Sequence, residues 1–168
     1  MREIPSKNYV IFAFVIIISI GIVAYCMRWY QMRTAIDKPQ VMDGLVSEIK
    51  SEEIADYLLD NPNVIVYIAP SNQKSNQALE QELHDFIIKK ELTNEFVYID
   101  SRKMTTETYQ QLEEQYLNDT LKNQSIDLSV TPNLWYFHEG KILDVMNTVS
   151  RKSSIHDVEY FLEKNGVY

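Results

Sequence analysis

Residues 9–27 carry no charged side chain, and this run of 19 residues constrains the chain more than any other feature. At about 1.5 Å per residue, a helix of this length is roughly 28 Å long, close to the thickness of a bilayer hydrocarbon core. Its isoleucine, valine and phenylalanine side chains favour insertion by roughly 3 to 7 kcal/mol in total. Trp29 and Tyr30 follow at interface height, beside Arg28. The sequence therefore predicts a stub over residues 1–8 and a single transmembrane helix over residues 9–30.

A cleaved signal peptide is the competing interpretation of this segment. The apolar region of a signal peptide is usually shorter and ends in a small-x-small cleavage site. Ala24, Tyr25 and Cys26 meet that pattern only in part, and Tyr25 is too large for the residue before a lipidated cysteine. We therefore favour a retained anchor, in which Cys26 is an ordinary apolar side chain near one end of the helix.

The cationic residues on the two sides of this helix are nearly balanced. Arg2 and Lys7 precede it, and Arg28, Arg33 and Lys38 follow it, so the positive-inside comparison is close to a tie. Because a stub of this size is typical of a cytosolic N-terminus, we expect a single-pass protein of the cell membrane whose C-terminal domain is extracytoplasmic.

Charge separates the chain into two parts. Its 16 basic and 24 acidic side chains give a net charge of −8; residues 1–38 hold five basic and two acidic residues, which leaves 11 basic and 22 acidic residues, a net of −11, in residues 39–168. This acidic part repels phosphate backbones and anionic lipid surfaces, so we expect no nucleic-acid partner. The single cysteine excludes an intrachain disulfide and a cysteine-rich zinc module.

The rest of the chain has the pattern of one α/β domain over residues 45–168, after a linker over residues 31–44 that contains Pro39 and Gly44. Apolar runs and helical spacing predict the order β-α-β-α-β-α-β-β-α. The expected strands are 45–49, 64–69, 96–99, 134–137 and 142–149, and the expected helices are 51–61, 76–92, 104–121 and a last one capped by Ser153 or Ser154. Strands separated by helices favour parallel pairing, and a turn over residues 138–141 makes the last two strands a hairpin.

Over residues 45–165 this pattern resembles the thioredoxin-like superfamily. The resemblance rests on the strand 64–69 that enters a loop and a long helix, and on Val130, Thr131 and Pro132 before the strand 134–137. It implies a mixed central sheet with flanking helices, and a cis peptide bond before Pro132 beside the loop. Compared with compact members of the family, residues 100–132 are longer, so we expect an extended third helix. The chain also looks like small bacterial membrane-anchored thioredoxin-like proteins, including those that accompany bacteriocin export.

The loop departs from the family where the family's chemistry takes place. Active members carry Cys-x-x-Cys at the start of the helix, where the helix N-terminus lowers the pKa of a thiol. Depending on one gap, the two cysteine positions fall here on Asn72 and Ser75 or on Gln73 and Asn76. Neither pair can form a mixed disulfide. The family's buried carboxylate in the preceding strand also has no counterpart, because residues 61–79 contain no Asp or Glu. We therefore expect that the domain is not an enzyme.

Other catalytic and metal chemistry finds little support in the sequence. Ser71 and Ser75 lack a nearby base or nucleophile elbow, and we expect Ser71 or Asn72 to cap the following helix instead. His84, His138 and His156 share no ligand spacing with one another or with the cysteine. The sequence predicts no catalytic residue, no metal site and no cofactor.

The remaining candidate is a groove that binds a protein or peptide partner by backbone pairing. Its predicted residues are Ser71, Asn72, Gln73, Lys74, Ser75, Asn76, Thr131 and Pro132. The competing interpretation is that this surface is a relic of the scaffold. We interpret the chain as a membrane-anchored, redox-inactive thioredoxin-like protein, an accessory of an envelope or export complex. The alternatives are a thiol-disulfide oxidoreductase relative that acts with a partner's thiols, and a purely structural module.

Overall fold

The computed structural model describes residues 6–36, 41–71, 73, 76–124, 126–147 and 154–168. The chain divides into two compact units, Met1–Lys38 and Pro39–Tyr168. Each unit is described by itself.

The described part of the first unit, residues 6–36, is one helix, α1 (Ser6–Ile36), of 31 residues. It extends beyond both ends of the predicted segment 9–30. Its most apolar window, Phe12–Trp29, has a mean hydropathy of 2.0, and none of its side chains is buried. The Ser19 hydroxyl donates to the carbonyl oxygen of Val15 at 2.8 Å, so it is satisfied within the helix. By length and composition, α1 is a helix that can span a membrane.

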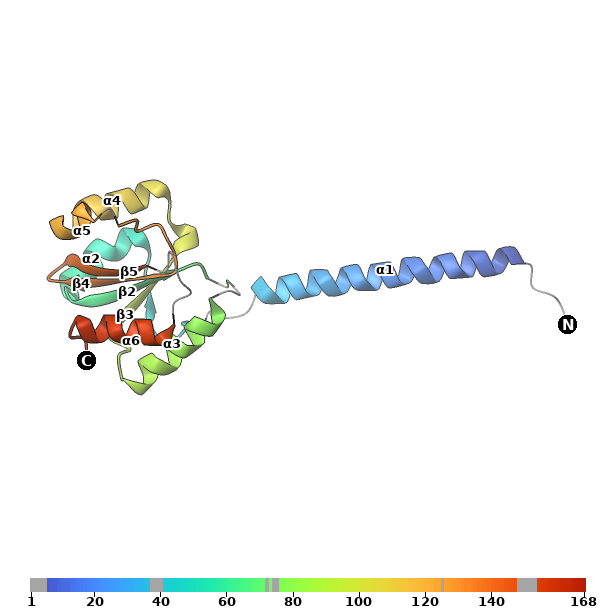
Figure 1. Ribbon diagram of the computed structural model, residues 1–168. Coiled ribbons are helices and arrows are strands. Elements are labelled where there is room, and N and C mark those ends of the chain that lie inside the picture. The colour runs from blue at the N-terminus through green and yellow to red at the C-terminus, as the bar shows by residue number, and fades with distance from the viewer. Residues whose placement is uncertain (1–5, 37–40, 72, 74–75, 125, 148–153) are drawn as a thin grey trace. The chain divides into compact units, whose positions relative to one another are not determined.

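The second unit is built on a five-stranded mixed sheet with the order β1-β3-β2-β4-β5 (Figure 1). The strands are β1 (Ser47–Glu48), β2 (Val64–Ala69), β3 (Phe96–Asp100), β4 (Asn133–His138) and β5 (Lys141–Asn147). The strands β1, β3 and β2 pair in parallel, whereas β4 pairs antiparallel with both β2 and β5. This confirms the mixed central sheet that the resemblance implies, although the first strand is shorter than the predicted 45–49.

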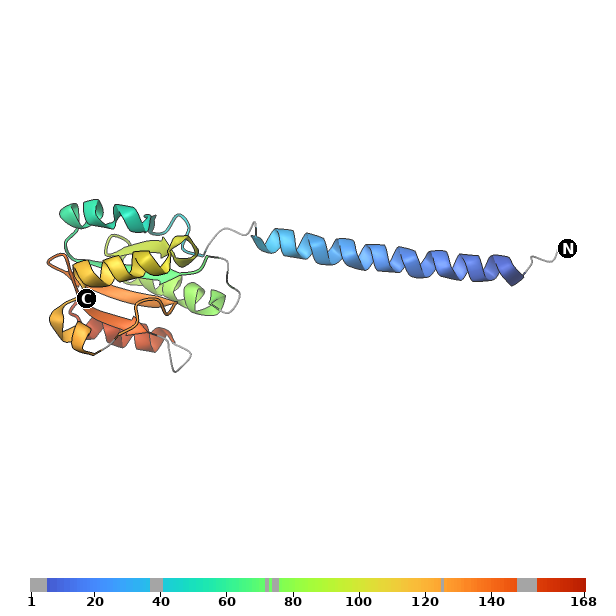
Figure 2. The same ribbon diagram turned by 90° about the horizontal axis from the view of Figure 1, so that it is seen from above.

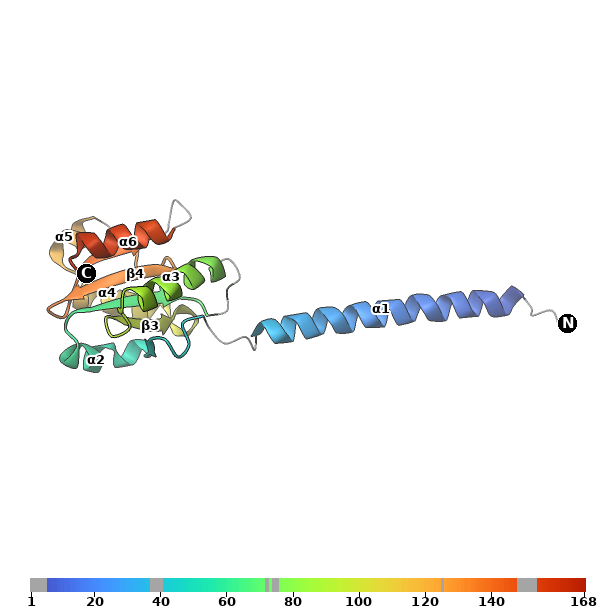
Figure 3. The same ribbon diagram turned by 90° about the horizontal axis from the view of Figure 1, so that it is seen from below.

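Helices cover both faces of the sheet. They are η1 (Ser51–Glu53), α2 (Ile54–Asp60), α3 (Gln77–Lys89), η2 (Ser101–Lys103), α4 (Thr106–Tyr116), α5 (Asp119–Asn123) and α6 (Ile155–Lys164). The helices α2, α4 and α5 lie on one face, and α3 and α6 lie on the other (Figures 1 and 3).

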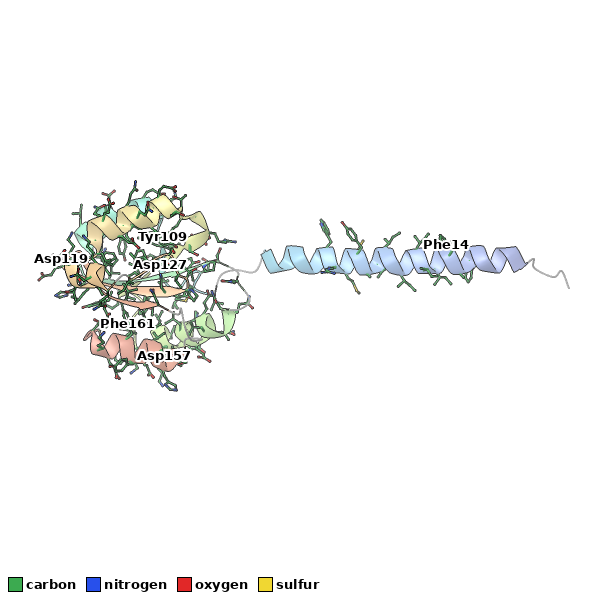
Figure 4. All side chains as sticks on the ribbon, turned by 45° about the horizontal axis from the view of Figure 1, so that its top comes forward. Phe14, Tyr109, Asp119, Asp127, Asp157 and Phe161 are labelled. Carbon is green, nitrogen blue, oxygen red and sulfur yellow. The ribbon has the colours of Figure 1, made fainter. Side chains whose placement is uncertain are left out.

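Two apolar cores meet at β2. Alternate residues of a strand point to opposite faces, so Val66 packs in the core under α2 and α4, while Ile65 packs in the core under α3 and α6. Tyr109 of α4 and Phe161 of α6 enter these two cores from opposite sides of the sheet (Figure 4). All six residues of β2 are buried, which explains why its sequence is a continuous apolar run.

The predicted single helix over residues 104–121 is wrong. The chain leaves the helix at Leu117, which forms a parallel bridge with Ile142 of β5. Asn118 then caps α5, because its side chain accepts from the backbone N–H of Leu121 at 2.8 Å. The same side chain donates to the carbonyl oxygen of Ile142 at 2.9 Å. These contacts with the edge of β5 divide the segment into α4 and α5.

The predicted turn over residues 138–141 and the predicted ends of the last helix are confirmed, whereas α3 ends at Lys89, short of the predicted 92. Glu139 and Gly140 have positive φ angles of 51° and 72°, as a two-residue hairpin turn requires. Ser154 caps α6 and forms a capping box with Asp157. Gly166 follows the end of α6 with a φ of 67°, a backbone conformation that glycine adopts without strain.

Replacing a residue of the core under α2 and α4 should cost far more stability than replacing an exposed residue. Phe137 of β4 is fully buried and packs edge-on against Tyr116, with ring centroids 5.7 Å apart. We expect Phe137→Ala to lower the free energy of unfolding by about 3 to 5 kcal/mol, through lost burial and the cavity it leaves. The measurement is urea denaturation of the full-length protein in detergent micelles, followed by near-UV circular dichroism.

The matched control for this prediction is Leu59→Ala. Leu59 of α2 is 81% exposed, so its truncation should change the free energy of unfolding by no more than about 0.5 kcal/mol. Equal losses in the two variants would contradict the assignment of Phe137 to the core.

Candidate functional site

The register of the central strands brings the two halves of the predicted groove to one end of the sheet. Ile68 of β2 is the pairing partner of Asn133 of β4. The loop 71–76 follows the end of β2, and Thr131 and Pro132 directly precede β4, so both segments leave the sheet at this end. The peptide bond between Thr131 and Pro132 is cis, as the resemblance implies.

The structure places the predicted site residues at different depths. Gln73 is exposed, Ser71 and Asn76 are buried, and Thr131 and Pro132 are half-buried. The other three predicted residues lie outside the described part of the chain; they are Asn72, Lys74 and Ser75.

Gln73 and Asn76 form a hydrogen-bonded pair just before α3. The Asn76 side-chain amide donates to Gln73 Oε1 at 3.0 Å, and the Asn76 backbone N–H donates to the Gln73 carbonyl oxygen at 3.0 Å. The two residues are one of the two pairs that the resemblance of the sequence aligns with the family's cysteine positions. An amide hydrogen bond therefore joins two side chains that cannot exchange disulfides.

Ser71 does not cap α3, so the prediction of that role for Ser71 is wrong. The N-cap position belongs to Asn76. The Ser71 hydroxyl donates to Asp100 Oδ2 at 2.8 Å, and its backbone N–H donates to Asp100 Oδ1 at 3.2 Å. Ser71 points into the domain and attaches the start of the loop to the end of β3.

Asp100 is a buried carboxylate with several donors around it. Besides Ser71, Arg102 donates from its backbone N–H at 3.1 Å and from its guanidinium at 2.8 Å. Burial on its own raises the pKa of Asp100, but the hydrogen bonds from Ser71 and Arg102 outweigh it, and the pKa lies below its ordinary value of 3.8. Asp100 therefore carries a negative charge that holds the loop, β3 and η2 together.

Glu80 is a second buried carboxylate, and the sequence prediction missed it. It lies in the first turn of α3, one residue beyond the segment 61–79, which contains no acidic residue. The Tyr67 hydroxyl forms a long hydrogen bond of 3.4 Å to Glu80 Oε1. Burial raises the pKa of the Glu80 carboxyl above its ordinary value of 4.5, and the hydrogen bond from Tyr67 offsets this only in part. Helical spacing could have identified Glu80, because it precedes the buried Leu83 by three residues and the buried Ile87 by seven.

Asn133 anchors the other half of the site. Its side chain is 1% exposed, and its amide nitrogen donates to the carbonyl oxygens of Leu128 and Val130, both at 2.8 Å. These bonds fix the segment that leads into Thr131 and Pro132. Asp100 thus holds the half of the candidate groove that begins at Ser71, and Asn133 holds the half that contains Thr131 and Pro132.

The histidines do not contribute to this site. His84 contacts its neighbour Asp85, His138 stacks on Tyr136, and His156 lies 3.4 Å from Glu159. Within the described residues, no group of three histidine, cysteine or acidic side chains is arranged to hold a metal ion. The chemistry that the described site offers is hydrogen bonding by amide and hydroxyl groups.

The mixed sheet, the helices on both of its faces and the cis bond before Pro132 define the class of fold: it is thioredoxin-like. Among solved structures, thioredoxin f2 of Chlamydomonas reinhardtii is similar to this chain, with a TM-score of 0.49 and 11% identity over 71% of this chain and 95% of that one. Thioredoxin O1 of Arabidopsis thaliana, in its oxidised state, is also similar, with a TM-score of 0.43 and 11% identity over 71% of this chain and 96% of that one. No model of a known protein family and no curated protein matches the chain.

The two buried carboxylates should respond to pH in opposite directions. The pKa of Glu80 is raised in the folded state, so its protonated form favours folding, and stability falls as pH rises from 4.5 through the folded pKa. We expect Glu80→Gln to gain stability relative to the natural chain over that window. The measurement is the free energy of unfolding of the full-length protein in micelles as a function of pH.

The contribution of Asp100 to the free energy of unfolding should have the opposite pH dependence, and the variant Asp100→Asn tests this. The pKa of Asp100 is lowered in the folded state, so its contribution is present above pH 3.8 and is lost as pH falls through the folded pKa. At neutral pH this variant should lose about 2 to 3 kcal/mol, because a buried charge that accepts several hydrogen bonds is replaced. If the two substitutions changed the free energy of unfolding with the same dependence on pH, the opposite pKa shifts of Glu80 and Asp100 would be contradicted.

Proposed function

We propose that this chain is a membrane-anchored thioredoxin-like protein without thiol-disulfide exchange activity, which binds a protein or peptide partner at the loop 71–76. The observation that carries the proposal is the hydrogen-bonded pair Gln73 and Asn76 ahead of α3, in a domain whose sequence contains no cysteine.

The absence of a thiol from residues 39–168 supports the redox part of the proposal. The one cysteine of the chain, Cys26, lies in α1. Disulfide exchange requires a thiolate that attacks a disulfide sulfur through a mixed disulfide. The domain has no group of its own for this step.

The anchoring of the loop supports the binding part. Asp100 holds Ser71 at one end of the loop, and the Asn76 backbone carbonyl accepts from the Glu80 N–H at 2.9 Å at the other. Between these ends, Gln73 exposes an amide-bearing side chain. A loop whose ends are fixed loses less conformational entropy on binding, and a partner can pair with it through backbone hydrogen bonds.

Helix α1 supports a place for this domain at a membrane. We infer that the N-terminal stub is cytoplasmic, that the domain is extracytoplasmic, and that the protein is an accessory of an envelope or export complex. We infer the export role from the resemblance of the sequence to bacteriocin-export accessory proteins.

Photocrosslinking tests the binding site. A photoreactive residue at position 73 of the full-length protein in native membranes should capture a defined partner, identified by mass spectrometry. The control is the same residue at Tyr160, which is 70% exposed on α6. Equal capture from both positions would contradict a site at the loop.

An insulin-reduction assay tests the redox part of the proposal. The full-length protein should show no turnover. Turnover that is abolished by Gln73→Ala or Asn76→Ala would instead favour an enzyme that acts with a partner's thiols.

Protease protection tests the orientation. A protease added to intact cells should digest residues 39–168, because we place them outside the cytoplasm. Permeabilised cells control for the intrinsic susceptibility of the domain. Digestion only after permeabilisation would reverse the orientation.

A further inference from the structure

A groove lies between α2 and α4, away from the loop 71–76. It encloses a cavity of about 310 Å³. Its floor is formed by the buried side chains of Ile54, Leu112 and Tyr116, and Gln111 and Gln115 line its α4 side. The two helices run side by side over the same face of the sheet (Figure 2). The groove therefore combines an apolar floor with polar walls.

The segments that border this groove are uniformly acidic. Residues 51–60 and 104–121 contain eight acidic side chains and no lysine or arginine. The acidic residues are Glu52, Glu53, Asp56, Asp60, Glu107, Glu113, Glu114 and Asp119. Among the described residues, Glu53 has a cationic partner, Lys50 at 3.8 Å, and the other seven have no ion pair. Two lysines outside these segments reach the end of α4, because Lys122 donates to the carbonyl oxygen of Glu114 at 3.4 Å and Lys141 donates to that of Gln115 at 2.6 Å. The negative charge of the rim is therefore least compensated along residues 51–60.

The negative charge reaches the cavity itself. Glu52 is one of the lining residues. Burial raises the pKa of Tyr116, and the charge of Asp56 adds to this, against the hydrogen bond from Gln115. That hydrogen bond, from Gln115 Nε2 to the Tyr116 hydroxyl, is 3.0 Å long. A cation at the rim would meet Glu52, and the exposed Asp56 directly follows the lining residue Ala55.

The opposite face of the sheet differs in its charges. The helices α3 and α6 each end in a lysine, Lys89 and Lys164, and Lys164 pairs with Asp144 at 2.8 Å. Lys90 lies over the ring of Tyr168 at 4.2 Å. Cations on that face offset part of its negative charge.

We propose that this groove is a docking site for a lysine- or arginine-rich segment of a partner protein, with one apolar side chain of that segment in the cavity. Cations of the segment would face the rim, where complementary charge speeds association and selects the partner. The apolar floor would contribute burial, which charge alone cannot supply. Phosphate-bearing partners and anionic lipids are repelled by the same charge.

The proposal does not depend on the loop 71–76. The two surfaces involve different residues, so either can fail while the other stands. A lack of capture from position 73 would not contradict peptide binding in the groove. A lack of peptide binding in the groove would not contradict the proposed function.

Peptide binding to the full-length protein tests the proposal. The protein is placed in nanodiscs of zwitterionic lipid, because anionic lipid would itself bind the probe. The probe is a fluorescein-labelled peptide of lysine and arginine with one central leucine, and the readout is fluorescence anisotropy. Glu52→Lys with Asp56→Lys should weaken binding at least about tenfold, since repulsion replaces attraction at the rim. The affinity of the natural chain should fall as salt screens these charges.

The control is Glu82→Lys with Asp85→Lys on α3, which changes the net charge by the same amount at exposed positions of the other face. This variant should bind the probe within about twofold of the natural chain. Equal weakening by both double variants would mean a general attraction to an acidic domain and would overturn the proposal, as would the absence of binding.

Two further measurements keep the test independent of misfolding. Glu52→Gln with Asp56→Asn removes the charge without adding any and preserves side-chain size, and it should also weaken binding. A second probe with serine in place of the central leucine should bind the natural chain more weakly. Equal affinity for the two probes would contradict the entry of an apolar side chain into the cavity.

Discussion

Burial of β2 on both faces is the constraint on which the rest of the domain depends. All six of its residues are buried, and its alternate side chains belong to two different cores. Such a strand is stable only if helices cover both faces and other strands pair with both edges, as β3 and β4 do here. The position of the loop 71–76 follows directly, because it leaves the sheet at the end of this strand.

Buried polar side chains then determine where that loop and the segment before β4 lie. A buried charge is tolerated when hydrogen bonds replace the water it has lost. Asp100 meets this condition with donors from Ser71 and Arg102, whereas Glu80 has a single long hydrogen bond from Tyr67. The environments of the two carboxylates shift their pKa values in opposite directions. The end of the sheet therefore remains organised by polar contacts in a domain that has no thiol.

Charge divides the molecule into parts with different possible partners. The net charge of −8 is the sum of a cationic segment around an apolar helix and a domain of net −11. Within the domain the acidic residues are not uniformly neutralised: α3 and α6 include lysines, while residues 51–60 and 104–121 include none. The loop and the groove between α2 and α4 are thus chemically distinct surfaces, one rich in amides and the other acidic over an apolar floor.

The sequence alone determined the features whose causes are local. The continuous apolar run of β2, the turn at Gly140 and the cap at Ser154 all depend on residues a few positions apart, so spacing and residue type were sufficient. Tertiary structure decided the rest, because the partners are distant in the chain. Ser71 is 29 residues from Asp100, and Asn118 is 24 residues from Ile142, whose carbonyl it binds. No local pattern contains either contact, so only the packed sheet could turn Ser71 inward and end α4 at Tyr116.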